Sequence, residues 1–215
     1  MSVPQFSAYL FDVDGTLVDS ATDICGAIQA VLATTRQSSV PDDLLRRYIG
    51  RHLYDLFGDL LPECTREQMD QMLADYRRIY LARNHTLTRA YAGIANTLSA
   101  LPGKKSTATT KGTPTTRSVL ELFGLLSYFD HVQGTDGFPA KPEPDVIFAS
   151  LKVLRVAAED CLLVGDSPAD MEAGRRAHVK TCAVLWGYGR REDLAKWEPD
   201  YWISDPRELL SGAGL

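Results

Sequence analysis

A buried strand that ends in two acidic residues is predicted near the start of the chain, within Tyr9–Thr16. Side chains alternate along a strand, so Asp12 and Asp14 should leave it on the same side, and Gly15 lets the backbone turn directly afterwards. Two carboxylates this close raise each other's pKa unless a cation lies between them. The pattern therefore favours either a divalent metal or an ionised nucleophile beside a protonated acid.

Two other structures share parts of this sequence pattern. A solvated Asp-Gly turn after a strand has the same local pattern. A calcium loop of the EF-hand type is excluded, because Gly15 follows the second aspartate directly and the apolar residues Leu17 and Val18 come next.

Three later segments also end in polar residues: Ser106–Gly112, Gly134–Asp145 and Cys161–Asp170. The last is an apolar run that reaches Asp166, after which Pro168 fits the first turn of a helix. In parallel α/β sheets, functional groups lie at the carboxyl ends of the strands. We therefore expect four strand ends to form one rim, although 102–108 is unusually polar for a core strand.

Four motifs in this order resemble the haloacid dehalogenase superfamily of phosphotransferases: Asp12–Thr16, Thr109, Lys141 within Lys141–Asp145, and Gly165–Asp170. Residues 170–177 and 184–189 are similar to the family's C-terminal half, so the resemblance covers nearly the whole chain. It implies an α/β fold with a Rossmann-like parallel sheet core and helices on both faces. A small all-helical cap would be inserted after the first core strand.

The resemblance also implies roles for the acidic residues. Asp12 would be the nucleophile that forms an aspartyl-phosphate, and Asp14 would protonate the leaving alkoxide and then activate the hydrolytic water. A carboxylate oxygen of Asp12, the backbone carbonyl of Asp14 and Asp166 would hold Mg²⁺, which prefers oxygen ligands beside a substrate phosphate.

Further residues would bind the phosphoryl group or support the site. Thr109 and Lys141 would hold phosphoryl oxygens, and Asp170, one helical turn beyond Asp166, would position Lys141. Ser167 and Gly15 would support these groups.

Alternatives remain open for two of these residues. Thr109 would also suit the cap of a helix that begins near Thr113, and Thr110 is a competing hydroxyl for substrate binding. Lys141 would also suit an exposed position before a proline turn, although two prolines restrict the backbone there.

A stretch with helical periodicity and no strands follows the first motif, with helices expected over 21–35, 41–48, 53–61 and 66–83. It resembles the helical cap of one subgroup of the superfamily. We therefore expect a catalytic core over 1–18 and 88–215 and a cap over 19–87. Core helices are expected near 94–101, 115–123, 144–154 and 168–178.

Substrate specificity is expected in the cap, where Arg51 and His52 follow Gly50 in a turn between helices. Arg51 would suit a substrate carboxylate because of its fork of donors. The alternatives are a surface arginine at a helix start and a histidine near a helix terminus that needs no ligand.

Residues that are present or absent at particular positions distinguish between the reactions of the superfamily. Asp14 favours a phosphatase over a dehalogenase, the lack of lysine before Pro102 argues against a phosphonatase, and Ile24 lies where a sugar-phosphate mutase has histidine. The segment Leu17–Ile24 resembles phosphoglycolate phosphatases, so 2-phosphoglycolate is the leading substrate. Sugar phosphates, nucleotides and pyrophosphate remain alternatives, as does a non-catalytic protein that binds a phosphorylated metabolite.

Composition narrows the class of partner. The net charge of −5, without a run of Lys or Arg, argues against nucleic-acid binding. The four cysteines show no C-x-x-C spacing, and we find no signal peptide or membrane-spanning stretch. We expect a cytoplasmic monomer or homodimer that acts on a small phosphorylated metabolite.

Overall fold

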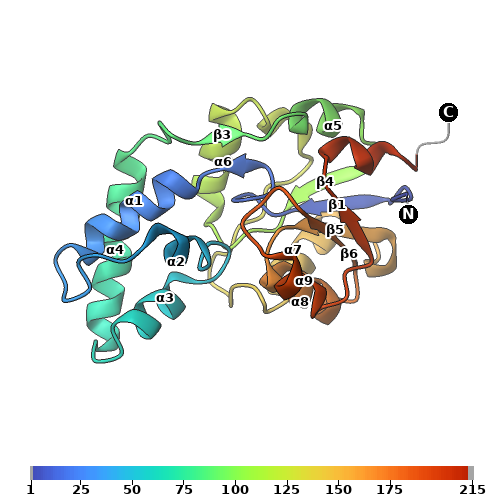
Figure 1. The fold of residues 1–215 in the computed structure, drawn as a ribbon. Helices are drawn as coiled ribbons and strands as arrows, with labels where there is room; N and C mark the ends of the chain where they lie inside the picture. The colour runs from blue at the N-terminus through green and yellow to red at the C-terminus, as the bar shows by residue number, and fades with distance from the viewer. Residues whose placement is uncertain (1, 213–215) are drawn as a thin grey trace.

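The structure is a computed structural model that describes residues 2–212, and its main sheet has five parallel strands (Figure 1). The strand order is β4-β1-β5-β6-β7. The strands are β1 (Ala8–Phe11), β4 (Lys104–Thr107), β5 (Cys161–Gly165), β6 (Lys180–Val184) and β7 (Tyr201–Ile203). Phe11 is in register with Thr107 and with Val164, so the carboxyl ends of three strands meet at one edge. The α/β fold class is confirmed.

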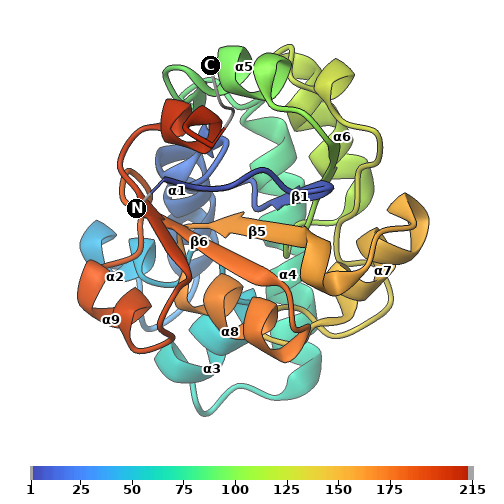
Figure 2. The same cartoon turned by 90° about the vertical axis from the view of Figure 1, so that its right-hand side faces the viewer.

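Helices cover both faces of the sheet, as Figure 2 shows for α5 above it and α8 below it. Alternation along β1 places Tyr9 and Phe11 in one apolar cluster and Ala8 and Leu10 in another. The first cluster includes residues of α5 (Ile94–Ala100) and α6 (Thr113–Leu122), and the second includes residues of α7 (Asp145–Leu154) and α8 (Pro168–Arg176). Outside the segment 18–90 described next, the other elements are α9 (Arg191–Ala195) and 3₁₀ turns at Leu126–Tyr128, Ala158–Asp160 and Pro206–Leu210.

Four helices, here called the helical segment, lie between β2 (Val18–Asp19) and β3 (Arg89–Ala90), which pair antiparallel. They are α1 (Ala21–Leu32), α2 (Asp42–Arg46), α3 (Leu53–Leu60) and α4 (Arg66–Ala82), drawn in blue to teal in Figure 1. They share an apolar cluster of their own, in which α1 packs against α4. All four expected helices are present with shorter ends. The boundaries of a separate cap domain stay a prediction.

The strand expected before Gly134–Asp136 is wrong. Within residues 2–212 this stretch makes an isolated bridge between Ser106 and His131, and the chain then continues as a loop. The N–H of Gln133 donates to the side-chain Oγ1 of Thr107 (2.8 Å), so the backbone ladder does not continue. The loop still lies beside β4.

The polar character of β4 is explained by its place at the edge of the sheet. Its buried hydroxyls find partners there, since Thr107 Oγ1 donates to the carbonyl of Gln133 (2.9 Å) and Ser106 Oγ donates to the carbonyl of Thr107 (3.1 Å). Buried polar groups are tolerated when they are hydrogen-bonded.

The structure also bears on membrane-spanning helices and on the state of the cysteines. Over residues 2–212, the helices lack the combination of length and apolarity that a membrane crossing requires. All four cysteines fall in that range and are free thiols.

Candidate active site

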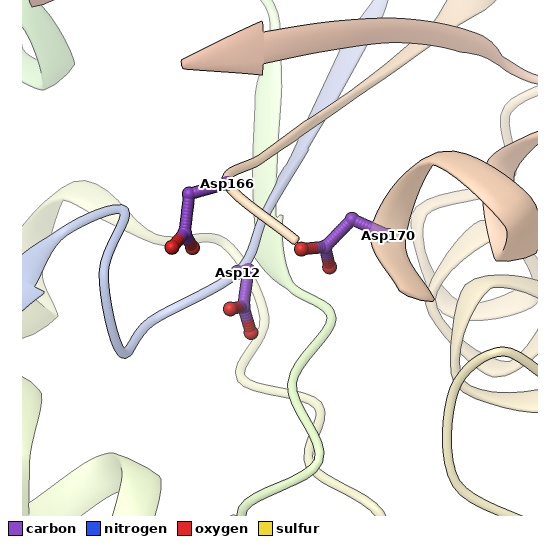
Figure 3. Close-up of side chains that lie close together, drawn as sticks. All are labelled: Asp12, Asp166 and Asp170. Carbon is purple, nitrogen blue, oxygen red and sulfur yellow. The ribbon is translucent and has the colours of Figure 1, made fainter. Parts of the chain in front are cut away.

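Three carboxylates converge at the ends of β1 and β5, as Figure 3 shows. Asp12 follows β1 and donates its N–H to the carbonyl of Val164 (2.9 Å), which brings it beside Asp166 at the end of β5. Asp170 lies in the first turn of α8. Oxygens of the three side chains lie within 4.8 Å of one another, and all three residues are buried.

Lys141 provides a buried positive charge in this cluster. Its Nζ lies 2.9 Å from Oδ1 of Asp12 and also donates to Oδ1 of Asp170. Burial lowers the pKa of the Lys141 ammonium, but the charges of Asp12 and Asp170 outweigh this effect and raise it overall. The alternative of an exposed lysine before a proline turn is wrong.

The other oxygen of Asp12 is left without a donor. Among the residues that the structure describes, no hydrogen-bond partner reaches Oδ2, although this atom is buried. Burial raises the pKa of Asp12 to about 6, with Lys141 opposing and Asp170 and Asp14 adding to the rise. This carboxylate has acceptor capacity that the described residues do not use.

Asp166 is a second acid whose pKa is raised in the folded protein. Burial, followed by the charges of Asp12 and Asp170, raises its pKa well above the usual value. Its oxygens accept from Thr16 Oγ1 (3.1 Å) and from the N–H of Tyr188 (2.7 Å). Three carboxylates around one lysine leave excess negative charge, which a bound cation would stabilise.

Asp170 is held by a capping box at the start of α8. Its Oδ2 accepts from the N–H (3.0 Å) and the Oγ (2.6 Å) of Ser167, while its Oδ1 accepts from Lys141. Both of its oxygens are therefore in use. Asp170 thus has the contacts expected of a residue that positions Lys141.

Two features of the structure favour glycine at position 15. Its φ of +91° lies in the left-handed region, and a Cβ at this position would overlap the carboxylate of Asp166.

Thr109 is buried just after β4, and its Oγ1 accepts from the N–H of Lys111 (3.3 Å). Helix α6 instead has Gly112 at its N-cap, and the carboxylate of Asp136 accepts from the N–H of Thr113 (3.1 Å). The interpretation of Thr109 as the helix cap is therefore wrong. Thr110 is half-buried and lines the cleft described below.

The carboxylate of Asp14 has partners outside the acidic cluster. Its Oδ1 accepts from Ser20 Oγ (2.6 Å), and its Oδ2 lies 3.2 Å from Nζ of Lys111. The two aspartates of the first motif thus have different partners, which is what a nucleophile and a separate acid require.

A cleft of about 550 Å³ is lined by Asp14 and Lys111 of the core and by residues of the helical segment. Arg51 and His52 both line it. Just before them, Gly50 lies so close to Ser167 that a Cβ would come 3.1 Å from the Cβ of Ser167. The turn between α2 and α3 therefore lies beside Ser167, which directly follows Asp166.

Arg51 and His52 also have the local partners that the alternative interpretations require. Arg51 pairs with Asp55 (3.5 Å) and lies over the ring of Tyr48. His52 is the N-cap of α3, and its Nδ1 accepts from the N–H of Tyr54 (3.2 Å). Burial lowers the pKa of His52.

The sequence of residues 9–184 matches the family model of the haloacid dehalogenase-like hydrolases. The chain belongs to this family. The match covers both aspartates of the first motif, the lysine and the second acidic motif, so the resemblance inferred from those motifs is confirmed. The expectation of a hydrolase of the phosphatase type is confirmed with it.

Individual members of the family resemble this chain over nearly its full length. A phosphoglycolate phosphatase from Aquifex aeolicus is 35% identical over 94% of this chain and 93% of its own. A pyrophosphatase PpaX from Listeria monocytogenes is 31% identical over 96% of both chains. The structure of a haloacid dehalogenase-like hydrolase from Streptococcus pneumoniae is 28% identical, has a TM-score of 0.89, and covers 97% of this chain and 99% of its own.

Sequence reasoning missed several residues that contact the site: Thr16, Ser20, Tyr80, Lys111 and Tyr188. One signal was available, since Lys111 comes two positions after Thr109 in the polar segment Ser106–Gly112. The hydroxyls and tyrosines carry no comparable pattern.

Proposed function

We propose that this chain is a Mg²⁺-dependent phosphatase that hydrolyses a small phosphate monoester through an aspartyl-phosphate on Asp12. The observation that carries the proposal is the unequal use of the two oxygens of Asp12. Oδ1 is held by Lys141, whereas buried Oδ2 has no donor among the described residues. A fixed carboxylate with a free lone pair is suited to attack phosphorus.

The acidic cluster fits Mg²⁺. Asp12 and Asp166, with the backbone carbonyl of Asp14, would hold the ion, whereas the charge of Asp170 is already paired with Lys141. Each carboxylate oxygen has two lone pairs, so Asp12 can bind a metal and still present a lone pair to phosphorus. When bound, Mg²⁺ neutralises charge on the phosphoryl oxygens.

The proposed chemistry has two steps. In the first, an oxygen of Asp12 bonds to phosphorus, the bond from phosphorus to the ester oxygen breaks, and Asp14 gives its proton to the leaving oxygen. In the second, Asp14 takes a proton from water, which attacks phosphorus and releases phosphate from Asp12. Proton transfer of this kind contributes about 10²–10⁴-fold to rate.

Positive and hydroxyl groups would hold the phosphoryl oxygens. Lys141 is cationic and fixed by Asp170, and Thr109 and Thr110 follow the neighbouring strand β4. Ser167 and Gly15 support this arrangement through Asp170 and Asp166. Positioned charges of this kind are the main contribution a protein makes to phosphoryl transfer.

The helical segment would act as a cap, with boundaries at residues 19–87. It forms one wall of the cleft, and Gly50 lies against Ser167 beside the acidic cluster. A cap in this position would exclude water and contact the part of the substrate that does not react.

The leading substrate is 2-phosphoglycolate. The phosphoglycolate phosphatase from Aquifex aeolicus supports this assignment, and Arg51 in the cleft wall would pair with the substrate carboxylate. His52 lines the same wall. Pyrophosphate is the second candidate because the relative from Listeria monocytogenes is a pyrophosphatase.

The test is phosphate release from 2-phosphoglycolate, sugar phosphates, nucleotides and pyrophosphate, with Mg²⁺ and with chelator. We expect release that requires Mg²⁺ and is fastest with 2-phosphoglycolate. Preference for another ester would leave the reaction in place and change the substrate. No release from any ester would favour a protein that binds a phosphorylated metabolite without turning it over.

A further inference from the structure

Lys111 joins the two sides of the cleft. Its Nζ lies 3.2 Å from Oδ2 of Asp14 in the core and donates to the hydroxyl of Tyr80 in α4 (2.9 Å). The ammonium also lies 4.3 Å from the centre of the Tyr80 ring, within the range of a cation–π interaction. The Lys111 side chain is 10% exposed, so solvent screens these contacts little.

Both backbone polar groups of Lys111, the N–H and the carbonyl, are hydrogen-bonded within the core. Its N–H donates to Thr109 Oγ1 (3.3 Å), and its carbonyl accepts from the N–H of Thr135 (3.1 Å). The start of the lysine side chain is therefore held by the core, whereas its charged end reaches the helical segment.

The carboxylate of Asp14 is oriented by two donors, one on each oxygen. Ser20, at the start of α1, donates to Oδ1 (2.6 Å), and Lys111 contacts Oδ2. Each aspartate of the first motif thus has its own lysine, since Lys141 contacts Asp12. Without Lys111, one oxygen of Asp14 would lose its partner and the carboxylate would gain freedom to rotate.

We propose that Lys111 is a positioning residue that orients Asp14 toward the leaving group, and that Tyr80 makes this orientation depend on the placement of α4. The inference rests on the proposed role of Asp14 as the acid of the phosphatase reaction. A general acid acts only within hydrogen-bond reach of the oxygen that it protonates. Loss of Lys111 therefore matters most for substrates whose leaving group needs a proton.

The experiment compares kcat/KM for two esters that lack a carboxylate, in the full chain with Mg²⁺. They are an alkyl phosphate, glycerol 3-phosphate, and an activated aryl phosphate, 2,4-dinitrophenyl phosphate. This parameter reports the steps through leaving-group departure, and dinitrophenolate leaves without a proton. We expect Lys111→Met to lower kcat/KM about tenfold or more for the alkyl phosphate and less than about threefold for the aryl phosphate. Tyr80→Phe, which removes only the hydroxyl, should shift the ratio in the same direction by a smaller factor.

The matched control is Lys105→Met, since Lys105 is also a buried lysine but lies within β4 and donates to the carbonyl of Gly103 (3.1 Å). We expect it to leave the ratio of the two values unchanged. Equal losses on both substrates in Lys111→Met, or no loss on either, would overturn the positioning role. An unchanged ratio in Tyr80→Phe would overturn the coupling to α4.

Failure of the proposed function gives a different result. In that case the unmodified protein would release no phosphate from either ester, or Asp12→Asn would retain full release. The ratio of kcat/KM for the two esters can be compared between a variant and the unmodified protein only when the unmodified protein is active. Failure of the positioning role of Lys111 is therefore distinguishable from failure of the phosphatase function.

Discussion

Oδ1 of Asp12 lies 2.9 Å from Nζ of Lys141, although the two residues are 129 positions apart in the chain. Both side chains are almost fully buried. A buried charge is unfavourable unless it is paired, and here Asp170 supplies a second carboxylate to the lysine. The pair joins the end of β1 to the loop before α7 and fixes the orientation of the proposed nucleophile.

Asp166→Asn is expected to raise the thermal stability of the metal-free protein and to abolish its response to Mg²⁺. Burial and the charges of Asp12 and Asp170 raise the pKa of Asp166, so its ionised form is unfavourable without a cation. In the unmodified protein, Mg²⁺ at a hundredfold excess over Kd should stabilise the fold by about 2.7 kcal/mol. The measurement is Tm with chelator and with Mg²⁺.

The control for this prediction is Asp193→Asn, which removes an acid from the surface of α9 that pairs with Lys196 (2.8 Å). It should keep the full Mg²⁺ response. A Mg²⁺-induced shift in Asp166→Asn as large as in the unmodified protein would exclude Asp166 as a ligand.

Arg51→Ala is expected to raise KM for 2-phosphoglycolate by about 10- to 100-fold, which corresponds to the loss of one charge-assisted hydrogen bond. For a neutral aryl phosphate the change should be small, because that substrate has no carboxylate. Steady-state kinetics with both substrates measures the difference. Arg47→Ala is the control, since Arg47 is an exposed arginine that pairs with Asp43 as Arg51 pairs with Asp55. Equal effects of Arg51→Ala on both substrates would contradict carboxylate recognition.

Much of the fold could be predicted from the sequence because its signals are local. Apolar runs such as Cys161–Gly165 indicated the central strands, and Pro168 indicated the start of α8. The strand before Gly134 was wrong because Gln133 bonds to the side chain of Thr107, which is a tertiary contact that no local pattern reveals.

The acidic part of the site was predictable for a related reason, whereas the contacts of Asp14 were not. Parallel strands place their carboxyl ends together, so Asp12 and Asp166 were expected at one rim. The contact between Lys111 and Tyr80 depends on how α4 packs against the core, across 31 positions of the chain. Helical periodicity predicts that α4 exists but not where its Tyr80 hydroxyl lies.

His52 should make stability depend on pH. Burial lowers its folded pKa below the ordinary value of 6.5, so the unfolded chain binds the proton more readily. Stability is therefore lost as pH falls below about 6.5. Because the ring is half-buried and screened, the slope should stay below the one-proton limit of about 1.4 kcal/mol per pH unit.

The variant His52→Asn tests this dependence, since asparagine still accepts a hydrogen bond at the N-cap of α3 but does not titrate. Denaturant unfolding from pH 8 to pH 5 should show the unmodified protein losing stability relative to the variant in the acidic half of the range. A constant difference between the two proteins would contradict the assigned protonation of His52.

The most direct test of the proposed mechanism is phosphate release by Asp12→Asn, measured beside the unmodified protein with Mg²⁺ and with chelator. The amide cannot form an aspartyl-phosphate, so we expect turnover to fall by at least about 10³-fold while circular dichroism shows an intact fold. Mg²⁺-dependent release that continues unchanged in Asp12→Asn would contradict the assignment of Asp12 as the nucleophile.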